Sequence, residues 1–170
     1  MQSDPPATIH PRRRAELRGE LPTYKNDEFP DKLKRNPEEK RNPPPIFLYG
    51  FACNEATLVR YAENNNITVR QGIEFSDTVR SIRDHMKKAF NTPFVRISPL
   101  DKRGEQGQRL YGVAAYNNRL YYTAPPCLEA ANKPTIPEVI GKIRLALEIF
   151  DEPRWYAESG ITWSELKRFI

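Results

Sequence analysis

The chain has 170 residues, a formal net charge of +5 and 16 prolines, nine of which fall within the first 45 positions. No stretch approaches the roughly 20 consecutive apolar residues of a transmembrane helix, so we expect no membrane-spanning segment. Two cysteines and two histidines are too few for a disulfide scaffold or a four-ligand zinc site, and we therefore expect neither a metal nor another cofactor.

Residues 1–45 combine frequent prolines with few large apolar side chains. Such a segment has too little apolar surface to offset the entropy lost on ordering it, and its prolines leave no room for a long helix. We therefore expect a charged, extended or intrinsically disordered arm over 1–45, followed by a single compact domain over 46–170. The arm either wraps its own domain, placing Tyr24 and Phe29 in a groove, or docks on another protein.

The first half of the domain is predicted to hold one strand and two helices. Residues 46–51 are a short apolar run, which indicates a buried strand. Asn54 is a suitable N-cap for a helix ending near residue 64, and Ser76 for a second helix that stops before Pro93. Apolar residues follow helical spacing along one side of this second helix, at Val79, Ile82, Met86 and Phe90.

Strand patterns follow in the middle of the domain. Alternating side chains predict a strand over 94–98, then a polar loop over 99–108 and a tyrosine-rich strand over 109–116. Asparagine tolerates positive φ, so residues 117–118, both asparagine, are predicted to form the two-residue turn of a hairpin. The second strand of that hairpin would be 119–124.

Two capping boxes mark helices near the C-terminus. Thr135 with Glu138 predicts a helix that ends before Pro153, and Thr162 with Glu165 predicts a short terminal helix. The apolar residues of the longer helix are expected to form one seam, at Ile136, Ile140, Ile143, Leu147 and Phe150.

Both tryptophans, Trp155 and Trp163, fall in this last part of the chain. We expect them to close the core, because a small domain needs large aromatic side chains to complete it; the alternative is a partner-binding tail. The order of elements predicts an α+β fold, in which helices pack on one face of a small antiparallel sheet of three to four strands.

The predicted hairpin gathers aromatic and basic side chains on one face of the sheet. With a two-residue turn, Tyr116 pairs with Arg119, and Tyr121 lies on the same face. Arg96 joins them if its strand runs alongside on the same side. Such a face can stack nucleic-acid bases or planar ligands while arginine neutralises phosphate. The alternative is that a helix or the arm covers these residues, so the four are candidate binding residues only.

No catalytic residue is predicted. Cys53 falls at the start of a predicted helix, where the helix dipole lowers a thiol pKa, but nothing in the sequence brings His85 near it. The two cysteines, Cys53 and Cys127, are expected to be buried thiols, and the sequence does not settle whether they pair. The pattern favours a protein that is not an enzyme.

The leading hypothesis is a non-enzymatic protein-interaction module that uses the arm, the sheet face or both. One alternative is RNA or single-stranded nucleic-acid binding through the Tyr/Arg face, although 1–45 and 46–170 are each only slightly basic. Another is a small enzyme or ligand binder with a cleft near Cys53. The N-terminus lacks the apolar region of a secretory signal, so we expect a soluble, intracellular protein, cytoplasmic or nuclear.

Overall fold

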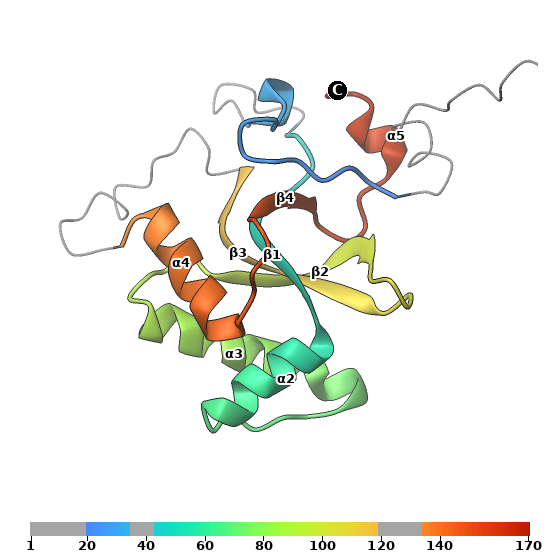
Figure 1. Ribbon diagram of the computed structural model, residues 1–170. Coiled ribbons are helices and arrows are strands. Elements are labelled where there is room, and N and C mark those ends of the chain that lie inside the picture. The colour runs from blue at the N-terminus through green and yellow to red at the C-terminus, as the bar shows by residue number, and fades with distance from the viewer. Residues whose placement is uncertain (1–19, 35–42, 119–133) are drawn as a thin grey trace, which may run out of the picture.

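The computed structural model describes residues 20–34, 43–118 and 134–170 (Figure 1). Four antiparallel strands form one sheet in the order β2-β3-β1-β4. The strands are β1 (Phe47–Asn54), β2 (Arg96–Arg103), β3 (Arg109–Asn117) and β4 (Arg154–Ala157). The described helices are α2 (Glu55–Asn64), α3 (Phe75–Ala89), α4 (Ile136–Leu147) and α5 (Trp163–Leu166), with the 3₁₀ turns η1 (Asp31–Leu33) and η2 (Gly72–Glu74).

The main core lies between one face of the sheet and helices α2, α3 and α4, which confirms the predicted α+β fold. Alternate residues of β1 and β3 point into this core, among them Phe51 and Val113. Ile82 and Met86 of α3 and Ile143 of α4 meet them from the helices. Figure 1 shows these helices gathered on one side of the sheet, while residues 20–34 and α5 lie toward its other end.

The opposite face of the sheet curls around a smaller apolar cluster. Leu48, Leu100 and Tyr156 are buried there, and a bridge between Leu100 and Glu158 brings the two edges of the sheet together. Gly112 makes room inside the curl, because a Cβ atom at this position would lie 2.8 Å from Leu100 Cδ2. A larger residue in the middle of β3 would displace the end of the Leu100 side chain from this cluster.

Residues 20–34 pack on the end of the sheet, which is the first of the two arrangements considered for the arm. Leu21, Phe29 and Leu33 are buried there. The Phe29 ring stacks on Trp155 with centroids 4.2 Å apart, and the backbones of Tyr24 and Trp155 exchange two hydrogen bonds of 3.1 and 2.8 Å. Trp155 thus closes the core as expected, and this part of the arm supplies its covering layer.

Local capping signals predicted three helix starts correctly. The side chains of Asn54, Thr135 and Thr162 accept hydrogen bonds from the backbone of the first turns of α2, α4 and α5. Ser76 is not an N-cap, because α3 already begins at Phe75, directly after η2, and the Ser76 hydroxyl donates to the Ile73 carbonyl instead. The 3₁₀ turn η2 runs directly into α3, and no side chain caps the start of this helix.

Two other predictions along these elements are wrong. Half of the expected polar loop over 99–108 is strand: β2 continues to Arg103, and only 104–108 form a tight turn, closed by a hydrogen bond from Gly104 N to Gln108 O, that leads into β3. Phe150 does not extend the seam of α4, since the helix ends at Leu147 and Phe150 is 94% exposed. Glu148, in the left-handed conformation at φ 54°, turns the chain away before Phe150 is reached.

The expected hairpin turn at 117–118 is also wrong. Asn117 belongs to β3, and the Asn118 side chain is completely buried and bonded to three backbone groups. Its Oδ1 accepts from Phe47 N, and its Nδ2 donates to the carbonyls of Leu33 and Pro45, each at 2.8 Å. Asparagine serves here as a buried connector, a use that the local sequence does not distinguish from a turn. The predicted second strand, 119–124, lies outside the described residues.

Candidate functional site

Two of the four candidate binding residues, Arg96 and Tyr116, fall within the described part of the chain. Arg119 and Tyr121 lie outside it. Cys127 lies outside it as well. The predicted face can therefore be followed only at Arg96 and Tyr116.

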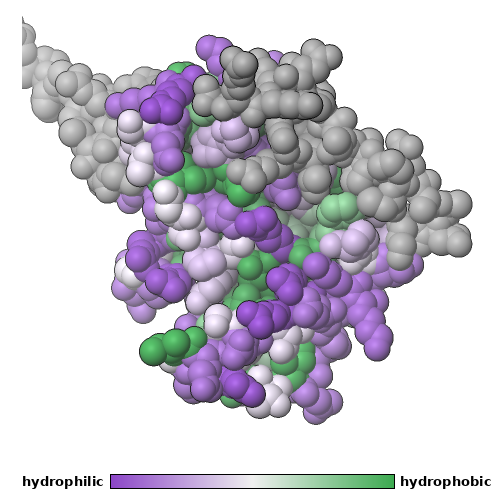
Figure 2. Space-filling model, turned by 180° about the vertical axis from the view of Figure 1, so that it is seen from behind, coloured by the Kyte–Doolittle hydropathy of each residue, from purple (hydrophilic) through white to green (hydrophobic). Residues whose placement is uncertain are grey.

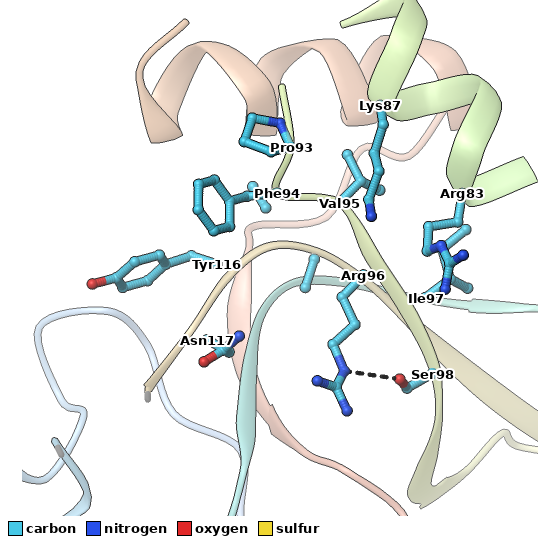
Figure 3. Close-up of a pocket in the computed structure, with 12 residues that line it drawn as sticks. Arg83, Lys87, Pro93, Phe94, Val95, Arg96, Ile97, Ser98, Tyr116 and Asn117 are labelled. Atoms are coloured by element: carbon cyan, nitrogen blue, oxygen red, sulfur yellow. Dashed lines mark hydrogen bonds between the residues drawn. The ribbon is translucent and has the colours of Figure 1, made fainter. Parts of the chain in front are cut away.

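A β-bulge separates the side chains of these two residues. Arg96 pairs with Ala114 across β2 and β3. Between β1 and β3 the register then shifts, so that Gly50 pairs with Ala114 but Tyr49 pairs with Tyr116, leaving Ala115 as an extra residue. Tyr116 consequently turns toward Trp155, with ring centroids 6.0 Å apart, and points away from Arg96 (Figure 3). Strict alternation fails at this position.

Arg96 and Tyr116 nevertheless line one pocket of about 340 Å³, called here the basic pocket. Its walls come from the C-terminal half of α3, residues 93–98 and the end of β3. Three cationic side chains contribute to the lining, those of Arg83, Lys87 and Arg96, and none of the lining residues is acidic. Pockets of this size are at the lower end of those that hold small ligands, about 300–1,000 Å³.

A stiff connection fixes the geometry of the basic pocket. At the end of α3, Asn91 adopts the left-handed conformation at φ 53°, and Thr92 N donates to the Lys87 carbonyl at 3.0 Å. This is a Schellman arrangement, which reverses the chain at the end of a helix. The Thr92 hydroxyl then accepts a hydrogen bond from Phe94 N at 3.2 Å. Lys87 and Phe94 are thereby held on opposite sides of the same opening.

The pocket has a cationic side and an aromatic side. Figure 3 shows Arg83 and Lys87 descending from α3 on one side, with the rings of Phe94 and Tyr116 on the other. Phe94 is partly buried and follows the exposed Pro93. The arrangement offers flat apolar surfaces and positive charge within one concavity.

The three cations differ in how strongly they are already engaged. Arg96 bonds Glu158 at 2.6 Å and Ser98 Oγ at 3.2 Å, and Arg83 bonds Asp84 at 2.9 Å. The Lys87 ammonium has no hydrogen-bond or ion-pair partner among the described residues. Lys87 is therefore the cation that an incoming anion meets without displacing a carboxylate.

Sequence patterns alone did not identify Arg83 and Lys87 as site residues. On an amphipathic helix such cations are ordinary members of the polar face. Their spacing of four residues places them on the same side of α3, and only the packing of α3 against β2 brings them to Arg96. The sequence feature that could have predicted them is a set of basic residues outside the apolar face of this helix, at Arg80, Arg83, Lys87 and Lys88.

A second cavity, of about 490 Å³, lies on the other side of Tyr116. Tyr49, Trp155 and the first turn of α4 line it, and it is mainly apolar. The indole of Trp155 already donates to Asn26 Oδ1 at 3.1 Å. Burial raises the pKa of the Tyr49 phenol, and the nearby Glu152 carboxylate acts in the same direction, so this hydroxyl stays protonated over the physiological range.

Cys53 lies in the main core rather than at an open helix start. Its side chain is 6% exposed, and burial raises the pKa of the thiol to about 12, the opposite of the lowering expected from the helix dipole. His85 Nδ1 lies 2.9 Å from the Tyr61 hydroxyl and packs against that ring. Cys53 lines neither of the two cavities described above.

Within residues 20–34, 43–118 and 134–170, no three His, Cys, Asp or Glu side chains are grouped so as to hold a metal ion. No helix in those ranges is long and apolar enough to cross a bilayer. The chain matches no protein-family model, no curated protein and no solved structure.

Proposed function

We propose that this domain is a non-enzymatic binding module for single-stranded nucleic acid, with one nucleotide held in the basic pocket. The observation that supports this most directly is the meeting of three cations and two aromatic rings in one concavity whose lining contains no carboxylate. Proteins that bind single strands combine positive charge along the backbone with aromatic side chains on which bases stack.

The cationic side of the pocket suits a phosphate group. Lys87 offers an unengaged ammonium, and the planar guanidinium of Arg83 can share its donors between Asp84 and a phosphate oxygen. Arg96 lines the pocket as well, but its guanidinium is already held by Glu158 and Ser98.

The aromatic side suits an unpaired base. Phe94 and Tyr116 present rings at the mouth of the pocket, and a base must leave its own stack to lie against them. A duplex hides the faces of its bases, so the arrangement favours a single strand. Stacking on an aromatic side chain contributes about 1–3 kcal/mol per base.

The protein-interaction hypothesis is less well supported by this geometry. The described part of the arm, residues 20–34, contributes buried side chains to its own domain and is not presented as a free ligand. An acidic peptide would use the cations of the basic pocket but would gain little from the rings of Phe94 and Tyr116. An acidic partner is therefore the rival outcome of the test below.

Fluorescence anisotropy with a labelled octauridylate, measured on the full chain at low and moderate salt, tests the proposal. Lys87→Gln should weaken binding, whereas Lys88→Gln, the same charge change one residue further along α3, should have a much smaller effect because Lys88 does not line the pocket. Phe94→Ala should weaken binding at least about fivefold, as expected for the loss of one stacked base.

Three results would count against nucleic-acid binding. The first is no detectable binding of octauridylate at low salt, where phosphate contacts are strongest. The second is an equal effect of Lys87→Gln and Lys88→Gln, which would indicate a general charge effect. The third is tighter binding of a hexaglutamate peptide than of octauridylate, which would instead point to an acidic protein partner.

A further inference from the structure

Two arginines face each other at the far end of the β2–β3 hairpin. Arg103 and Arg109 are direct cross-strand partners, and both are exposed. Side chains in such positions have Cβ atoms about 4.5–5.5 Å apart, and like charges placed there destabilise a sheet. The pair is thus an unfavourable arrangement for an isolated hairpin.

Nothing in the described structure neutralises this pair. Neither guanidinium has a hydrogen-bond or ion-pair partner among the described residues. Asp101 and Glu105 are close in sequence, but neither carboxylate forms an ion pair with Arg103 or Arg109, and Lys102 adds a further positive charge. The end of the hairpin therefore presents two unengaged planar cations side by side.

The turn holds the two arginines in place. Gly104 N donates to Gln108 O, and Gly107 N donates to Gly104 O, both at 2.9 Å. Gly107 supplies the positive φ of 74° that the turn requires. Because the turn closes directly beyond Arg103 and Arg109, their backbones cannot separate to relieve the repulsion.

A row of cations connects this hairpin to the basic pocket. The start of α3 lies near the hairpin, where Phe75 packs on Tyr111 with ring centroids 5.9 Å apart, and its C-terminal half lines the basic pocket. Helix α3 therefore runs antiparallel to β2. Its cations between these two ends occupy one side of the helix, at Arg80, Arg83 and Lys87. Arg80 pairs with Asp77 and Arg83 with Asp84, so a phosphate would share these two guanidiniums with the aspartates.

The length of this path can be estimated from strand geometry. From Arg96 to Arg103, β2 advances about 23 Å at ~3.3 Å per residue. A strand of nucleic acid must therefore extend several nucleotides beyond the pocket to reach the hairpin.

Hydrophilic side chains predominate on the back of the molecule, where the visible apolar patches are small (Figure 2).

We infer that Arg103 and Arg109 form a second phosphate site, which binds the same single strand of nucleic acid that occupies the basic pocket. This inference rests on the proposed function. A phosphate between the two guanidiniums can accept charge-assisted hydrogen bonds from both and cancels their repulsion. The hairpin would then set a minimum ligand length, since a dinucleotide in the pocket is too short to reach it.

The test compares di- and octauridylate binding to the full chain and to the double variant Arg103→Gln/Arg109→Gln. The variant should bind octauridylate about tenfold more weakly, the size expected for losing one charge-assisted phosphate contact, and should bind diuridylate as the native protein does. The slope of log K against log salt for octauridylate should fall by about 0.7, the value for one phosphate on a single strand.

The control variant Lys102→Gln removes one charge from the same strand outside the arginine pair, and it should change octauridylate binding much less. The melting temperature of the double variant should be unchanged or higher, because a repulsive pair has been removed, so that unfolding cannot explain weaker binding. If the native protein binds octauridylate but the double variant binds it equally well, the second site is refuted while the proposed function stands. If the native protein binds neither oligonucleotide, both fail.

Discussion

Replacing Asn118 with alanine is expected to destabilise the domain severely, because this side chain ties the end of β3 to two other backbone segments, at Leu33 and at residues 45–47. Its Oδ1 accepts from Phe47 N in β1, and its Nδ2 donates to the Leu33 and Pro45 carbonyls, all at 2.8 Å. The residue is completely buried. Alanine would leave one N–H and two carbonyl groups without these partners.

The expected loss in the free energy of unfolding depends on whether water can reach the backbone groups that lose their partners. Each buried polar group left unsatisfied costs about 1–3 kcal/mol. The Phe47 and Leu33 partners are buried, whereas the Pro45 contact is only partly so, and its carbonyl can regain a water molecule. Two fully buried groups give an expected loss of about 3 kcal/mol, a large part of the roughly 5–15 kcal/mol that stabilises a typical domain.

Urea denaturation followed by tryptophan fluorescence measures this loss, since Trp155 is buried against the segment that Asn118 holds. Asn65→Ala is the control: it removes one hydrogen bond, to the Tyr61 carbonyl, at a partly exposed helix end and should cost no more than about 1 kcal/mol. In Asn118→Ala, trypsin should also cleave faster at Lys32 and Lys34. Equal losses for the two variants, or a loss below about 1 kcal/mol for Asn118→Ala, would refute the reasoning.

Two further predictions concern the core. Phe29→Ala removes a 4% exposed ring that stacks on Trp155, and it should lower the free energy of unfolding in urea by about 3–5 kcal/mol. Phe150→Ala, at a 94% exposed position, should change this free energy little, and similar effects of the two variants would contradict the packing of residues 20–34. In a Cys127→Ser background, Cys53 should resist iodoacetamide near pH 8.5 until the protein is unfolded, because burial raises its thiol pKa to about 12 and little thiolate forms below that pH; rapid alkylation of the folded protein would contradict this.

The features predicted correctly from the sequence are those decided by neighbours in the chain. Thr135 and Glu138 form both bonds of a capping box within one helical turn, so their spacing alone predicts the start of α4. The strand β4 was missed for the opposite reason. It has four residues, and its partner β1 lies about a hundred positions earlier, so that only the folded sheet defines it. The partners of Asn118 are similarly distant.

In the candidate site too, local patterns were predicted from the sequence, whereas contacts between distant segments were not. Arg96 and Tyr116 were proposed from strand alternation, and both line the basic pocket, but the expected shared face is interrupted by the bulge at Ala115. A bulge depends on how two strands meet, and the β3 sequence alone does not specify it. Lys87 was indistinguishable from other polar-face residues of its helix until α3 was placed beside β2.

The bulge also explains why the basic pocket has an aromatic wall. Without an extra residue at Ala115, Tyr116 would follow the alternation of Ala114 and point to the side of the sheet occupied by Arg96 and Glu158. With it, the ring turns toward Trp155, which is itself stacked on Phe29 of the arm. One wall of the proposed nucleotide site is thus supported by the residues that hold the arm in place. Residues 20–34 and the pocket are parts of one packed unit, which gives this part of the proline-rich segment a structural role at the site as well as in the core.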